Sequence, residues 1–273
     1  MQQQGAELIS QKAPVIVCGM PRSGTTFVGQ LLRCHPGIAV ADEFPLPVLL
    51  SVPQLLSEVG GLLSAPFEGW RQAELSSVPL RKMRLLIQLW AAVTGDREQA
   101  RRLLVPDIRP GVKTPSAELY YQFYEDVFAL APPLWIYCVR HPFKVLRSFA
   151  SMPWASGKVV EQVSDLYRRS LEAYCELEHL ASERVLPVGI DHAGDIGLPR
   201  LQWASSILAL ANEVPTLEVN RFIGEWPRMD HWNAADGQRR AAASIDAESL
   251  VWFAKQRHIR HFCQKFGFDL GSC

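Results

Sequence analysis

Residues 14–34 contain the feature that most constrains this chain: a short apolar run, a glycine-bounded loop and an amphipathic segment. The run Pro14–Cys18 is apolar and rich in β-branched residues, which predicts a buried parallel strand. The loop GMPRSGTT follows directly, and a helix is predicted from Ser23 to about Cys34, where His-Pro-Gly ends it. A strand, a loop and a helix in this order predict an anion-binding turn in a parallel α/β sheet.

The loop itself is suited to an oxyanion. Backbone N–H groups at a helix N-terminus point at one spot, the helix dipole adds positive charge, and an arginine fork matches oxyanion geometry. The candidate anion-binding residues are Arg22, Ser23, Gly24, Thr25 and Thr26. Gly19 and Gly24 have the spacing of the ordinary phosphate loop, but position 25 is Thr where that loop has Lys. We therefore interpret the loop as an anion site and not as a turn without a ligand. Without the Lys, this site is poorly equipped for a triphosphate.

Strands and helices alternate along the rest of the sequence. Further strands are predicted at 38–40, 134–139 and 184–189. Residues 112–115 are predicted to be a strand end or a turn. Helices are predicted at 80–93, from an N-cap at Ser116 to about 130, from Pro142 onward, and at 159–181, 201–211 and 247–266. Residues 215–240 are predicted to be loop. With 273 residues and 48% hydrophobic content, the chain is predicted to be one α/β domain with a central parallel sheet flanked by helices, similar to P-loop NTPases.

Composition excludes several other classes. Lys plus Arg equals Asp plus Glu at 28 each, which argues against nucleic-acid binding. The apolar runs are far shorter than the roughly 20 residues that span a bilayer, and the N-terminus does not resemble a signal peptide. Six cysteines without a CxxC pair predict a reduced, cytoplasmic protein. The histidines form no HxxxH or HxH pair, so no metal site is predicted. The oligomeric state stays open.

A second motif follows the strand predicted at 134–139. Arg140 stands at its end, and Ser148 follows eight residues later in a predicted helix. Taken alone, such a pair is as often structural as functional. Together with the loop, it resembles the sulfotransferases that use 3′-phosphoadenosine 5′-phosphosulfate (PAPS), whose loop is P-[RK]-S-G-T-[TS]. The resemblance implies that Pro21–Thr26 bind the 5′-phosphosulfate, and that Arg140 and Ser148 bind the 3′-phosphate.

Further matches point to the tyrosylprotein and bacterial branch of that family. The loop carries Arg22 where cytosolic members usually carry Lys. Glu43 follows Arg22 by 21 residues, as the catalytic base does in that branch, with Asp42 as the alternative base. Lys113 stands in Val-Lys-Thr-Pro, similar to the Lys-Asp-Pro of the branch, with Thr in place of Asp.

The resemblance implies a mechanism. An acceptor hydroxyl attacks sulfur in line, Glu43 takes its proton, and Arg22 and Lys113 stabilise charge on the bridging and leaving oxygens. PAPS is the donor, 3′-phosphoadenosine 5′-phosphate (PAP) is the product, and no metal is required. The resemblance covers about 14–150, the nucleotide-binding core, and leaves 151–273 as a mostly helical remainder with an acceptor-binding or lid role.

The acceptor is the least specified part. A small metabolite, glycolipid or natural-product hydroxyl fits a chain with no predicted membrane span. Candidate lining residues for its pocket are Trp70, Trp90, Trp154, Trp226, Trp232, Tyr120 and Tyr121, although core positions explain such residues equally well. Phe27 is predicted to be core, and the pair Arg239 and Arg240 is a weak candidate for closing over the nucleotide. Two alternative functions stay open: a P-loop kinase or nucleotide hydrolase, and a non-catalytic nucleotide-binding protein.

Overall fold

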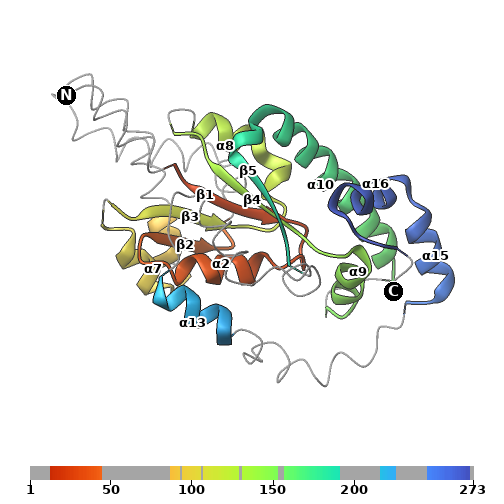
Figure 1. Cartoon of the computed structure of the whole chain (residues 1–273), viewed down its shortest axis with the longest axis horizontal. Helices are drawn as coiled ribbons and strands as arrows, with labels where there is room; N and C mark the ends of the chain where they lie inside the picture. The colour runs from red at the N-terminus through yellow and green to blue at the C-terminus, as the bar shows by residue number, and fades with distance from the viewer. Residues whose placement is uncertain are drawn as a thin grey trace.

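Five parallel strands form the centre of the structure, in the order β2-β3-β1-β4-β5 (Figure 1). The strands are β1 (Val15–Gly19), β2 (Ile38–Asp42), β3 (Arg109–Lys113), β4 (Leu134–Val139) and β5 (Val185–Gly189). The computed structural model describes residues 13–44, 87–92, 94–105, 107–128, 131–152, 157–190, 216–225 and 245–270. β1 lies between β3 and β4, so the loop that follows it starts at the middle of one sheet edge.

Helices cover both faces of this sheet (Figure 1). One face is covered by α2 (Thr25–Arg33) and α13 (Leu217–Glu225). The other is covered by η1 (Ala117–Tyr120), α8 (Tyr121–Val127), α9 (Pro142–Ala150), α10 (Val159–Ala181), α15 (Ala247–Lys255) and α16 (Arg257–Phe266). The short α7 (Arg97–Arg102) contacts β2, and η2 (Ser182–Arg184) leads from α10 into β5.

Side-chain alternation along β1 divides the core into two hydrophobic clusters. Val15 and Val17 pack in the cluster on the α2 face, whereas Ile16 and Cys18 belong to the larger cluster on the α10 face. Successive residues of a strand point to opposite faces, and both faces of a parallel sheet are normally covered by helices. The uninterrupted apolar run is therefore explained by burial on both sides, and the predicted fold class is confirmed.

The helix predicted at 247–266 is wrong in one respect, because it is two helices. Gln256 has extended backbone geometry (φ −61°, ψ 130°) and separates α15 from α16. Phe253 and Ile259, six residues apart, would face directions about 120° apart in one continuous helix. The break lets both side chains enter the same core cluster.

The loop predicted at 215–240 is also wrong in part, because α13 lies within it. Val219 and Phe222, three residues apart, are buried on one face of this helix in the cluster that contains α2. Their contact partners are far away in the sequence, so the local pattern carries little of the signal. The helix predicted at 201–211 and the pair Arg239 and Arg240 lie outside the described residues.

Ser116 does not act as the predicted helix N-cap. Its backbone is left-handed (φ 63°), its side chain makes no capping hydrogen bond, and the segment begins with η1 before α8. Its N–H instead donates to the carbonyl of Gly19 (2.8 Å), so tertiary contact with β1 sets its conformation. None of the described helices combines the length and apolarity needed to cross a membrane.

Candidate active site

The predicted site residues come from four neighbouring strands. The loop follows β1, Asp42 ends β2 with Glu43 next, Lys113 ends β3, and Arg140 follows β4. Parallel strands end at the same edge of a sheet, and this edge is where ligands bind in open α/β folds. The topology therefore brings together motifs that lie more than 100 residues apart.

A cavity of about 750 Å³ opens at this edge. It is lined by Pro21, Arg22, Gly24, Thr25, Thr26, Phe27, Glu43, Pro115, Arg140, Arg147, Ser148, Ser151 and Ile190. Most of the predicted site residues are in this set; Ser23 and Lys113 are not. Phe27, predicted to be core, packs against Phe222 of α13 (ring centroids 5.7 Å apart) and also lines the cavity.

The loop presents the N-terminus of α2 to the cavity. Gly24 is the N-cap residue in left-handed geometry (φ 96°), and no side chain caps the first N–H groups of the helix. Such groups attract an anion because they carry partial positive charge and lack intrahelical partners. The Ser23 hydroxyl is buried and has no hydrogen-bond partner within the described residues. These features fit a phosphate or sulfonate group.

The two predicted anion subsites are in direct contact. Arg22 Nε donates to Ser148 Oγ (2.9 Å), across 126 positions of sequence. Arg140 Nη1 donates to the backbone carbonyl of Arg22 (3.2 Å). The loop after β1 and the β4–α9 segment therefore form one cationic wall. Arg147, exposed on α9, adds a third guanidinium that the sequence reasoning missed.

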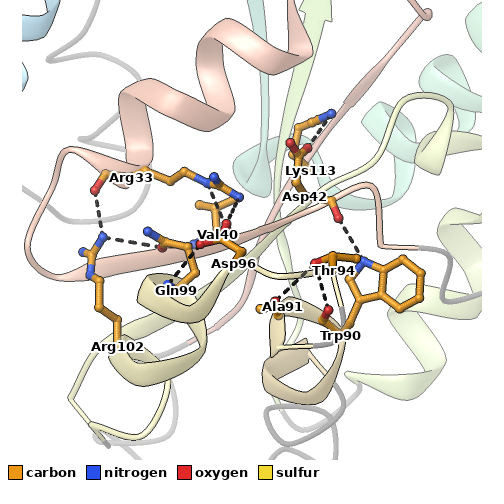
Figure 2. A network of polar contacts seen from close by, with 10 residues as sticks. All are labelled: Arg33, Val40, Asp42, Trp90, Ala91, Thr94, Asp96, Gln99, Arg102 and Lys113. Carbon is orange, nitrogen blue, oxygen red and sulfur yellow. Dashed lines mark hydrogen bonds and ion pairs between the residues drawn. The ribbon is translucent and has the colours of Figure 1, made fainter.

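Lys113 joins the two candidate bases. Its Nζ forms ion pairs with Asp42 Oδ1 (2.5 Å) and with Glu43 Oε1, and Figure 2 shows the ion pair with Asp42. The Lys113 side chain is 4% exposed, whereas those of Asp42 and Glu43 are 45% and 63% exposed. Of the two carboxylates, Glu43 is the one that lines the cavity. Lys113 therefore approaches the cavity through its contact with Glu43.

Trp90 supports the segment at the end of β2 that carries Asp42 and Glu43. Its indole N–H donates to the backbone carbonyl of Asp42 (2.9 Å), as Figure 2 shows. Its ring packs edge-on against Phe44. Thr114 Oγ1 donates to the carbonyl of Phe44 (2.8 Å). Of the two roles weighed for Trp90, these contacts support packing against the core cluster. The sequence does not reveal this role, because a single tryptophan does not indicate which distant residues it contacts.

Arg102 of α7 holds the turn between α2 and β2. Arg102 donates to the carbonyl groups of Arg33 (2.8 Å) and Ile38 (2.5 Å), and also to that of His35. These carbonyls lie at the end of α2 and the start of β2, where the helix leaves acceptors unpaired. Figure 2 shows the contact with Arg33. Arg102 thus stabilises the α2–β2 turn.

Left-handed backbone geometry is concentrated around the cavity. Within the described ranges, the non-glycine residues with positive φ are Arg22 (72°), Glu43 (50°) and Ser116 (63°). Two of them line the cavity, and the third follows Pro115, which also lines it. Such residues persist where the surroundings determine the backbone, and they cluster at functional sites.

Comparisons with known proteins identify the family of the chain. Residues 14–189, more than half of the chain, match the model of the sulfotransferase family. The chain belongs to the sulfotransferase family. Membership of the sulfotransferase family, predicted from the loop and from Arg140 with Ser148, is confirmed. No curated protein sequence matches the chain.

Two solved structures share the fold of this sulfotransferase. The sulfotransferase domain from the Synechococcus PCC 7002 olefin synthase has a TM-score of 0.54 at 16% identity, covering 94% of this chain and 96% of that chain. The sulfotransferase STF9 from Mycobacterium avium has a TM-score of 0.50 at 18% identity, covering 98% of this chain and 80% of that chain. These likenesses extend past residue 189 and support one α/β domain.

Gly19 is predicted to be indispensable to the sulfotransferase loop. A Cβ there would lie 2.4 Å from the Cys138 carbonyl oxygen, and φ is 118°. Gly19→Ala is expected to lower the free energy of unfolding by about 2–4 kcal/mol, from overpacking and backbone strain. Gly95→Ala is the control, since φ is 85° but nothing lies within 4 Å, and about 1 kcal/mol is expected. Urea denaturation followed by circular dichroism measures both, and equal losses would contradict the expectation.

Proposed function

We propose that this sulfotransferase takes PAPS as its donor and sulfonates a hydroxyl group of a small metabolite, glycolipid or natural product, releasing PAP. The observation that carries the proposal is the joined wall of Arg22, Arg140 and Ser148 in one cavity. A donor with anionic groups at both its 5′ and 3′ positions needs two cationic subsites. A nucleoside diphosphate lacks the 3′-phosphate, so it would leave the subsite of Arg140 and Ser148 without an anion to bind.

The residues present fit such a donor. The uncapped N-terminus of α2, Arg22, Thr25 and Thr26 would hold the 5′ end, and Ser23 would support the loop from within. Arg140 and Ser148 would hold the 3′-phosphate. When bound, PAPS supplies an activated sulfonate. The family favours this function over the kinase or hydrolase alternative, and Thr25 in place of Lys agrees with that preference.

Glu43 is the proposed general base. It lines the cavity, its side chain is largely exposed there, and its carboxylate accepts the acceptor's hydroxyl proton. Lys113 orients that carboxylate, and its charge also stabilises the negative charge on the bridging and leaving oxygens. Arg22 stabilises negative charge that develops in the cavity during transfer. No metal is assigned a role; no group of His, Cys, Asp or Glu in the described ranges is arranged to hold one.

We also propose a division of labour along the chain. Residues 14–150 form the donor-binding core, and 151–273 supply the acceptor-binding or lid region. Apart from Ser151 and Ile190, the cavity-lining residues all precede residue 150, which supports the first half of this division. The acceptor half rests on the sequence alone.

The test is calorimetric titration of the whole chain, without metal, with PAP and with AMP, which lacks only the 3′-phosphate. Wild-type protein is expected to bind PAP more tightly than AMP. Arg140→Ala is expected to weaken PAP binding about 10- to 100-fold, the value of one or two charge-assisted hydrogen bonds, while leaving AMP nearly unchanged. Lys144→Ala is the matched control: Lys144 is exposed on α9 but does not line the cavity.

Two outcomes contradict the proposed donor. Equal affinity for PAP and AMP would remove the 3′-phosphate subsite. Binding of ADP or ATP only in the presence of Mg²⁺ would favour the kinase or hydrolase alternative. Tight PAP binding without any transfer from PAPS, across a broad acceptor screen, would favour the non-catalytic alternative.

A further inference from the structure

Glu118 is a buried carboxylate beneath the anion-binding loop. It belongs to η1, its exposed fraction is 0%, and it forms no ion pair with a cation within the described residues. Burying a carboxylate without a cation is costly unless hydrogen bonds satisfy it. The residue therefore needs a specific explanation, and the proposed mechanism does not use it.

Both carboxylate oxygens of Glu118 are occupied. Oε2 accepts from the backbone N–H of Gly19 (2.9 Å), and Oε1 accepts from Ser170 Oγ of α10 (2.5 Å). Tyr137 OH lies 2.8 Å from Ser170 Oγ, so a chain of hydroxyl groups from β4 and α10 ends on the carboxylate. Burial raises the pKa of Glu118, and these hydrogen bonds oppose part of that rise.

The same segment holds the other polar group of Gly19. The Gly19 carbonyl accepts from Ser116 N–H (2.8 Å), so two successive peptide planes are bonded to residues 116–118. Gly19 ends β1 and starts the loop with φ 118°. The direction in which the chain leaves the sheet at this point determines where the following N–H groups and Arg22 lie.

We propose that Glu118 is a positioning residue that holds the anion-binding loop in its binding geometry through the N–H of Gly19. Residues 116–118 follow the end of β3, Lys113, after only two intervening residues. The contact with Gly19 therefore also fixes the end of β3 relative to the loop. The inference rests on the proposed function to the extent that the loop binds the donor's 5′ end. It adds to the mechanism a residue that touches neither donor nor acceptor.

The first test compares two substitutions of similar size in the full chain. Glu118→Gln keeps an acceptor for Gly19 N–H, whereas Glu118→Met removes it without leaving a cavity. PAP affinity by calorimetry is expected to stay within about threefold of wild type for Gln and to fall about tenfold or more for Met. Glu176→Met is the matched control, because it removes a carboxylate that accepts from Tyr121 outside the site, and it is expected to leave PAP affinity unchanged.

The second test needs no ligand. Hydrogen exchange of the peptide covering residues 17–26 is expected to speed up in Glu118→Met but not in Glu118→Gln, while peptides within α10 keep their wild-type rates. A purely structural role would speed exchange in both regions together. If the Met variant does not fold, Glu118→Asp replaces it, since a shorter side chain withdraws the carboxylate from Gly19, and the same two changes are expected.

The outcomes separate this inference from the proposed donor. Wild-type protein that fails to bind PAP but shows the expected exchange pattern would overturn the donor and leave the positioning role standing. Wild-type PAP affinity together with unchanged exchange in the folded Met or Asp variant would overturn the positioning role and leave the donor standing.

Discussion

Glu43→Gln is expected to lower kcat for sulfonate transfer by about 10²- to 10⁴-fold, the usual contribution of a general base. Gln is close in size and keeps an oxygen for Lys113, but it cannot take the hydroxyl proton. PAP affinity is expected to stay near the wild-type value, because the proposed role of Glu43 is to take the acceptor's proton and not to bind the donor anions. Initial rates at saturating PAPS, with an acceptor identified by screening, measure the effect.

Asp42→Asn is the matched control for this prediction. Asp42 shares the Lys113 ion pair with Glu43 but does not line the cavity. Its substitution is expected to change kcat by less than about tenfold, because it alters the surroundings of the proposed base but does not remove the base. A large loss in Asp42→Asn with little change in Glu43→Gln would instead make Asp42 the base.

Arg22→Gln is expected to lower kcat by about 10²- to 10³-fold, comparable to the loss of one preorganised donor at a developing negative charge. PAP affinity is expected to fall as well, because Arg22 also holds Ser148 at the second subsite. Arg22→Lys keeps the charge, and the loop pattern accepts either residue, so it is expected to recover most of the lost rate. Kinetics and PAP titration of the three proteins test both parts.

The control for Arg22 is Arg168→Gln. Arg168 lies on the surface of α10, where it pairs with Asp165 (2.6 Å) and Glu172 (3.0 Å) away from the cavity. Surface ion pairs contribute at most about 1 kcal/mol, so wild-type kinetics are expected. If Arg22→Gln keeps its wild-type kcat, Arg22 is not the group that stabilises the developing charge.

The proposed base and the loop after β1 are connected through β3. Lys113 holds Glu43, Glu43 N–H donates to the Lys113 carbonyl (2.7 Å), and the next residues reach Gly19 through Ser116 and Glu118. The proposed catalytic carboxylate and the anion-binding loop are therefore two or three contacts apart. This explains how a site assembled from loops can have a defined geometry without disulfides, since the cysteines in the described part of the chain are free thiols.

Some features of this site were predictable because their signals are local. The strand, loop and helix at 14–34 combine burial, glycine spacing and a helix start within a few residues, and all three leave direct marks on the sequence. Arg140 and Ser148 were found because the spacing between a strand end and the next helix repeats within a family. β3 was only partly predicted, since Pro110 and Gly111 are poor strand formers, and neighbours on both sides hold them in the sheet.

The sequence by itself therefore determined the sulfotransferase family, the parallel sheet and the candidate anion-binding residues. Only the tertiary structure decided that Lys113 pairs with Asp42 and Glu43, that Trp90 supports the β2 end, and that the Glu118 carboxylate meets Gly19 N–H. The physical reason is distance along the chain. A lysine, a tryptophan or a buried glutamate acquires its role from a partner 48 to 99 residues away, and strand order, which local patterns do not encode, brings that partner near.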